Sequence, residues 1–278
     1  MNKKNKVLLT SVGLALLSGI AATGSTFAWF TTTRTASVSY SKATVKSGQS
    51  NLLIDYVSSL NTMTESQAGS LLTLTGGNMV TDISGNGLNF YKPVWSANPA
   101  IASSINEVVF SSSADGKFID FTISVTIEGE ASMNVYLGKD TVISAFDDAD
   151  PKSVKAVASS RMAVIVDDAA VLYYAPDLDG AYPLSAASST PVAIASATTT
   201  ELSPAPVASF TTHTSNPDGF AGRILSLEPT ESVDGAGDWS ATKNVTFRAW
   251  VEGQDADCDN DAIGGIFNIN IDLFALEA

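Results

Sequence analysis

The sequence contains one cysteine, Cys258, and one histidine, His213, among its 278 residues. A single cysteine cannot form a disulfide within the chain, so buried area, a bound ion or assembly must stabilise the fold. A single histidine excludes an HExxH zinc site, and no GxSxG turn marks a serine nucleophile. We therefore expect a protein that is not an enzyme and that holds no cofactor, unless calcium binds as described below. An enzymatic interpretation also stays open, that of a secreted hydrolase in which two carboxylates face each other.

Basic residues are also scarce, because 15 lysines and arginines stand against 29 aspartates and glutamates, a net charge of −14. Three of the basic residues and none of the acidic ones lie in the first 28 residues, so a chain cleaved there carries a net charge of −17. Such a chain repels nucleic acid and anionic lipid, and we expect neither as a partner. The hydrophobic content of 45% is enough to build a core.

Residues 1–28 have the pattern of a signal peptide. Lys3, Lys4 and Lys6 precede an apolar run over residues 7–20, which is short for a membrane span of ~20 residues. The small residues that follow predict cleavage between Ala28 and Trp29. We therefore predict a secreted or cell-surface protein that meets a signal peptidase during export and leaves the membrane after cleavage. An uncleaved anchor helix is the alternative.

The mature sequence is dominated by strand patterns. Apolar residues alternate over residues 118–128, 243–251 and 267–276, the period of a half-buried strand. In the second segment Trp250 falls on the opposite face, which suggests a second packing surface. Gly- and Asn-rich turns separate the strands, so we predict an all-β, two-sheet, jelly-roll-like sandwich in a single domain over residues 46–278. Shorter strand candidates are residues 51–57, 71–75, 88–95, 105–111, 133–137, 141–146, 161–166 and 171–175.

Three segments depart from this pattern. Residues 151–159 predict a short helix, with Asp150 as its cap and Pro151 at its first position. Residues 51–60 also have a helical apolar spacing, so strand and helix both stay open there. Residues 185–214 are rich in Ser, Thr and Pro and predict a long solvated loop, with an adhesive or O-glycosylated tip as the alternative.

The acidic run at residues 255–261 is the best candidate for an ion site. Asp255, Asp257, Asp259 and Asp261 alternate like the first half of a calcium loop. The glycine and the closing glutamate of such a loop are absent, so a solvated turn between two strands is the other interpretation. Residues 147–150 and 177–180 are weaker candidates of the same kind.

The new N-terminus at residues 29–45 is rich in Thr, Ser, Val and aromatic residues and contains no Gly or Pro. It predicts one long strand, which is either the first strand of its own sandwich or a strand lent to a neighbour. The residues that would carry such pairing are Trp29, Phe30, Thr35, Val38, Tyr40 and Val45.

Two segments resemble the TasA/CalY (camelysin) family of secreted biofilm-matrix fibre proteins of Gram-positive bacteria. They are GSTFAWFTTTRTASVSYSKATV at the processing region and RAWVEGQDADCDNDAIGGIFNINIDLF near the C-terminus, with PKSVKAVASSRMAVIV as a weaker third match. The resemblance covers about a quarter of the chain. It implies a jelly-roll subunit that forms fibres with copies of itself by donor-strand exchange, with residues 29–45 as the donor. The alternative function is a monomeric secreted adhesin or a calcium-dependent binding module.

Overall fold

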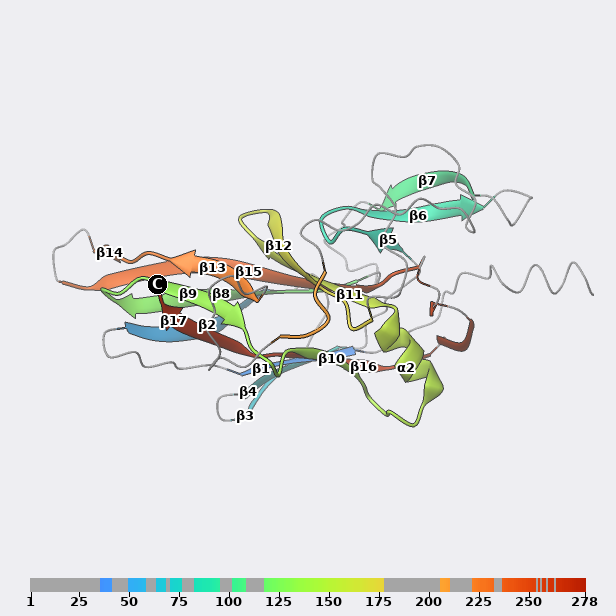
Figure 1. The fold of residues 1–278 in the computed structure, drawn as a ribbon, viewed down its shortest axis with the longest axis horizontal. Coiled ribbons are helices and arrows are strands. Elements are labelled where there is room, and N and C mark those ends of the chain that lie inside the picture. The colour runs from blue at the N-terminus through green and yellow to red at the C-terminus, as the bar shows by residue number, and fades with distance from the viewer. Residues whose placement is uncertain are drawn as a thin grey trace, which may run out of the picture.

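The structure, a computed structural model, describes residues 36–41, 50–58, 64–68, 71–76, 83–95, 102–108, 118–177, 206–210, 222–232, 237–253, 255, 257–258, 260–262 and 264–278. These residues form an all-β sandwich with one short helix, α2, as the sequence predicts (Figure 1). The leader at residues 1–28 lies outside the described part of the chain.

Two large sheets make up the sandwich. The first contains, in order, β10 (Val142–Ala145), β16 (Phe267–Ile271), β1 (Ala36–Ser41), β4 (Leu71–Gly76) and β3 (Thr64–Ala68). The second contains β12 (Ala169–Tyr174), β11 (Ser160–Val166), β15 (Trp239–Val251), β8 (Ile119–Gly129) and β2 (Ser50–Ser58), with β14 (Thr230–Glu231) paired to β15.

Two smaller sheets complete the fold. One is formed by β13 (Arg223–Leu227), β9 (Met133–Leu137) and β17 (Leu273–Glu277). The other, β5 (Ser84–Gly85), β6 (Phe90–Trp95) and β7 (Ala102–Val108), stands at one end of the molecule, above the second large sheet (Figure 1). Residues 51–60, for which strand and helix were both open, therefore contain a strand, β2.

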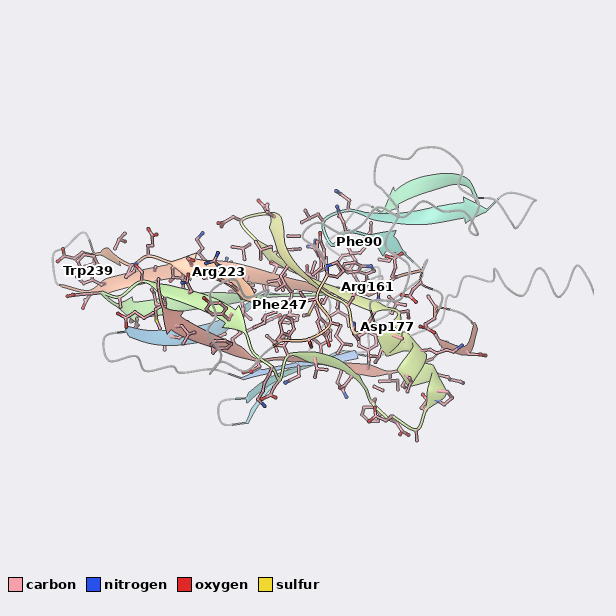
Figure 2. The ribbon with its side chains drawn as sticks, in the orientation of Figure 1. Phe90, Arg161, Asp177, Arg223, Trp239 and Phe247 are labelled. Carbon is pink, nitrogen blue, oxygen red and sulfur yellow. The ribbon has the colours of Figure 1, made fainter. Side chains whose placement is uncertain are left out.

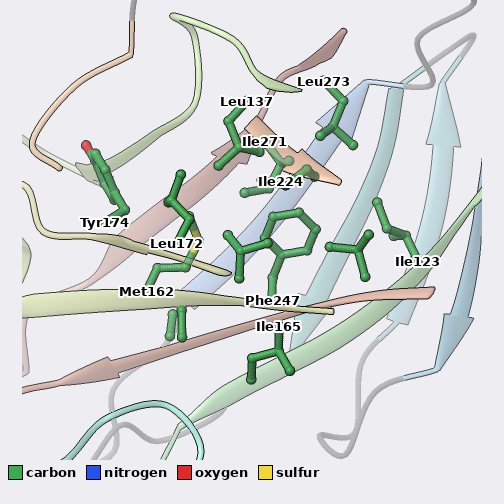
Figure 3. Packing of buried hydrophobic residues seen from close by; sticks show 14 of the residues in the cluster. Ile123, Leu137, Met162, Ile165, Leu172, Tyr174, Ile224, Phe247, Ile271 and Leu273 are labelled. Atoms are coloured by element: carbon green, nitrogen blue, oxygen red, sulfur yellow. The ribbon is translucent and has the colours of Figure 1, made fainter. Parts of the chain in front are cut away.

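The core lies between the large sheets and is built by the predicted alternation. Ile123, Val125 and Ile127 of β8 are fully buried, and the polar residues between them are half-buried. Phe247 of β15 stacks on Phe121 of β8, with ring centroids 5.0 Å apart. Figure 3 shows this ring surrounded by aliphatic side chains from several strands. Burying each such side chain contributes about 1.5–3 kcal/mol, so this interior is the main source of stability.

The predicted strand at residues 267–276 is divided at Asp272 into β16 and β17, which belong to different sheets. The hydroxyl of Thr141 donates to the carbonyl of Asp272 and accepts its backbone N–H, both at 3.0 Å. The N–H of Gly138 donates to the same carbonyl. These bonds turn the chain from one sheet to the other, so the predicted strand at residues 267–276 connects two sheets.

Trp250 confirms the second packing surface, because it is completely buried on the outer side of the six-stranded sheet. The ring of Phe90 meets it edge-on at 5.2 Å, and its indole Nε1–H donates to the carboxylate of Glu252 at 3.1 Å. The segment that carries Phe90 therefore covers part of this outer face.

The helix α2 (Pro151–Ala158) confirms the predicted helix. Its N-cap is Asp150, whose carboxylate accepts the backbone N–H groups of Lys152 and Ser153, and Pro151 stands at the first position. Such a cap satisfies two of the N–H groups that a helix start leaves unpaired.

Residues 206–210 belong to no helix or strand, as the predicted loop requires, but the prediction that this loop is solvated is wrong there. Val207 forms a bridge with Tyr174, and its N–H donates to the carbonyl of Tyr173 at 2.9 Å. Phe210 is buried and stacks on Tyr174 at 5.4 Å. This short piece therefore covers the edge of β12 instead of leaving the core; the rest of residues 185–214 lies outside the described part.

Candidate assembly site

The strand predicted at residues 29–45 is described over residues 36–41, where it forms β1. This strand occupies the middle of the five-stranded sheet of its own chain, between β16 and β4 (Figure 1). Of the two interpretations left open by the sequence, the structure therefore has the intramolecular first strand. The other predicted residues of this region, Ala28, Trp29, Phe30, Thr35 and Val45, lie outside the described part.

The register of β1 matches the alternation of its neighbours. Val38 is paired with Ile269 of β16 on one side and with Leu74 of β4 on the other. Tyr40 is paired in the same way with Ile271 and Leu72. Positions 38 and 40 of β1 are therefore in register with Ile269 and Ile271 of β16, which are both buried.

The two sides of β1 differ in direction. It runs antiparallel to β4 but parallel to β16. Among the named strands of the described residues, this is the one parallel pairing, and parallel pairing is slightly less stable per residue. If β1 left its position, β16 and β4 would both become open edges with unpaired backbone groups.

The chain leaves β1 toward the other large sheet. Eight residues, 42–49, separate β1 from β2, and an extended segment of that length spans at most about 28 Å. In the described part of the chain, the position of β1 is set by its pairing with β16 and β4.

In the acidic run at residues 255–261, Asp255 and Asp261 are paired with different basic residues. Asp255 is buried and its carboxylate is paired with the guanidinium of Arg161, at the start of β11 beside α2 (Figure 2). Arg161 also donates to the carbonyls of Ala158 and Ser160, at 3.1 and 2.8 Å. Burial raises the pKa of the Asp255 carboxyl, while the N–H of Asp257 and the charge of Arg161 oppose that rise.

Of the other predicted calcium ligands, the structure describes Asp257 and Asp261. Asp261 is exposed and its carboxylate is 3.4 Å from the ammonium of Lys155, Asp257 is half-buried, and Asp259 lies outside the described residues. Within the described ranges, no cluster of three or more His, Cys, Asp or Glu side chains is arranged to hold a metal. The sequence contained no signal for Arg161, which is 94 residues from Asp255.

A hollow of about 860 Å³ lies at the far end of the sandwich, where Trp239 is labelled in Figure 2. Glu128, Glu130 and Asp238 line it, and all three are exposed. A hydrolytic pair needs one carboxylic acid kept protonated, usually by burial. These exposed side chains do not provide that environment, so the hollow does not favour the hydrolase interpretation.

The described part of the chain includes no helix long and apolar enough to cross a membrane. No protein-family model and no curated protein matches the sequence.

Proposed function

We propose that the mature chain is a structural subunit of an extracellular fibre, and that its N-terminal strand pairs with the sheet of a neighbouring copy. The observation that carries this proposal is the place of β1, the first described strand, which completes the five-stranded sheet from between β16 and β4.

An identical strand from a second copy satisfies the same backbone groups. The two sides of β1 contribute main-chain pairing to β16 and β4, in the register in which Val38 is paired with Ile269 and Leu74. Exchange of an identical strand between copies costs little free energy, because each backbone hydrogen bond lost within the chain is formed again between chains. Each subunit then gives one strand and receives one, which produces a chain of subunits joined head to tail.

Composition and fold support a structural role. A single cysteine leaves the fold without an internal disulfide, and self-association is one way for such a secreted domain to gain stability. The resemblance to biofilm fibre proteins points in the same direction. The calcium-dependent alternative has less support, because Asp255 is already paired with Arg161.

A cysteine pair across β1 and β4 tests the proposal. Ser39 and Thr73 are directly paired, so Ser39→Cys with Thr73→Cys, in a Cys258→Ser background, places two thiols within disulfide reach. Oxidation of monomers should lock β1 in its own sheet and prevent polymerisation, and reduction should restore it.

The same pair reports exchange in assembled protein. Oxidation after assembly should join neighbouring subunits and give a ladder of covalent oligomers on a non-reducing gel, while Ser39→Cys alone should give none. Electron microscopy checks that fibres are present. Fibres that yield only internally cross-linked monomers, or mature protein that stays monomeric at every concentration, would overturn the proposal.

A further inference from the structure

The two edge strands of the six-stranded sheet, β12 and β2, differ in what pairs with them. At one edge, residues 206–210 cover β12 through the bridge between Val207 and Tyr174. At the other edge, β2 is paired with β8, and no other strand of the described residues pairs with it. An edge strand presents a row of backbone donors and acceptors that favours pairing with another strand.

The sequence of β2 does little to prevent such pairing. The strand is nine residues long and contains neither lysine nor proline, the residues that commonly protect an edge. Its irregularity falls between Tyr56 and Ser58, which leaves residues 50–56 in regular register. Leu53 and Val57 are 36% and 47% exposed, so apolar side chains lie on the outer face of this edge.

We propose that β2 pairs antiparallel with β2 of a second copy, about a two-fold axis that passes between the two Leu53 residues. In this register Leu53 meets Leu53 of the second copy and Leu52 meets its Ile54. Asp55 meets Asn51 of the second copy, so no two like charges are directly opposed. The six-stranded sheets of two copies then form one continuous sheet.

A second copy is the occupant because the strand is complementary to itself in this register. The neighbouring pairs of the same sheet, β2 with β8 and β8 with β15, are antiparallel, so a two-fold pairing continues the pattern. The buried row that contains Leu52 and Ile54 also continues across the new pair.

The contact is small, so a pair of isolated subunits associates weakly. The negative net charge of each copy opposes association at low salt, and screening over about 8 Å at physiological ionic strength reduces this repulsion. When many subunits are joined in one fibre, many β2 edges act together and hold fibres side by side. This lateral contact uses an edge that the proposed exchange of β1 does not occupy.

Two lysine substitutions in the full mature chain test the contact. Leu53→Lys places like charges directly opposite each other across the two-fold axis and should raise the dimer dissociation constant at least ~10-fold. Val57→Lys makes the same charge change on the same strand, beyond the paired segment, and should leave dimerisation unchanged. Analytical ultracentrifugation at increasing salt measures both; equal effects of the two variants would overturn the proposal.

Cross-linking tests the register. In a Cys258→Ser background, Leu53→Cys should form a disulfide-linked dimer under mild oxidation, because paired Cβ atoms lie about 4.5–5.5 Å apart. Asp55→Cys, on the same strand, meets Asn51 instead of itself and should cross-link at least ~10-fold more slowly. Equal cross-linking of the two variants, or none with Leu53→Cys, would overturn this register.

The two proposals fail in different ways. Fibres that form normally but give no Leu53 cross-link contradict the β2 pairing alone. Leu53-linked dimers in protein that never forms fibres contradict the exchange of β1 alone.

Discussion

Arg161 and Asp255 form an ion pair in which the side chains are 3% and 0% exposed. The pair joins the start of β11 to the loop that follows β15, and Arg161 also donates to the carbonyl of Ala158, the last residue of α2, and to that of Ser160, the first residue of β11. Asp255 in turn accepts the N–H of Asp257 at 2.9 Å. One buried arginine therefore holds a helix end, a strand and an acidic loop in a single arrangement.

Removing Asp255, the acidic partner of Arg161, should strongly destabilise the fold. Asp255→Ala leaves the guanidinium of Arg161 buried without its counter-charge, and we expect a loss of about 3–5 kcal/mol in the free energy of unfolding, measured by urea denaturation. Asp261→Ala removes the exposed pair with Lys155 and should cost about 1 kcal/mol or less. Similar losses from both variants would contradict the role assigned to burial.

Two glycines with nearly the same backbone conformation should respond differently to alanine. Gly87 has φ +78°, and a Cβ added there would clash with the Cβ of Ala163; Gly237 has φ +77° and no atom within 4 Å of such a Cβ. Gly237→Ala should cost only the ~1–2 kcal/mol of the left-handed conformation, whereas Gly87→Ala should cost about 1–3 kcal/mol more. Denaturant unfolding measures both, and equal losses would show that the space around Gly87 adjusts.

The helix cap should depend on pH. The hydroxyl of Ser153, together with the N–H groups of Lys152 and Ser153, lowers the pKa of the Asp150 carboxyl below its ordinary value of 3.8. A lowered pKa in the folded state means that the cap stabilises the fold above this value and loses its effect as the pH falls through the folded pKa. An NMR titration of the Asp150 carboxyl should show this low midpoint, and Asp150→Asn should remove the dependence. A midpoint at or above the ordinary value would contradict the observed cap.

In alkaline solution, Tyr173 should lose its proton at a higher pH than an ordinary tyrosine does. Burial raises its pKa to about 12, and its hydroxyl donates to the carbonyl of Asn86. Because the folded state favours the neutral phenol, its contribution to stability is complete below about pH 10 and is lost as the pH rises through 12. In a pH titration followed by the absorbance of ionised tyrosine, part of the absorbance change should occur near pH 12, and this part should be smaller in Tyr173→Phe. An unchanged titration in that variant would contradict the assignment.

The regular parts of the fold follow from local pattern. The alternation over residues 118–128 and 243–251 corresponds to β8 and β15, and the cap and proline at 150–151 correspond to the start of α2. Even the outward Trp250 indicated a second packing surface, which Phe90 covers. These features depend on neighbours in sequence, so the sequence displays them directly.

The features that sequence reasoning missed depend on distant partners. The division at Asp272 depends on Thr141, and the pairing of Asp255 depends on Arg161. β13 is a short strand, and no alternation long enough to detect marks it. At the candidate assembly site, the sequence predicted the strand but left open which sheet it joins.

The pairing of β1 with β16 has a consequence for the order of events during synthesis. β1 is the first described strand to leave the ribosome, whereas β16 begins only at Phe267. This sheet therefore cannot close until the growing chain has reached Phe267, because until then one of the two neighbours of β1 has not been made. Until β16 is made, β1 has only β4 as a neighbour in this sheet, so its other side can pair with a strand of another molecule.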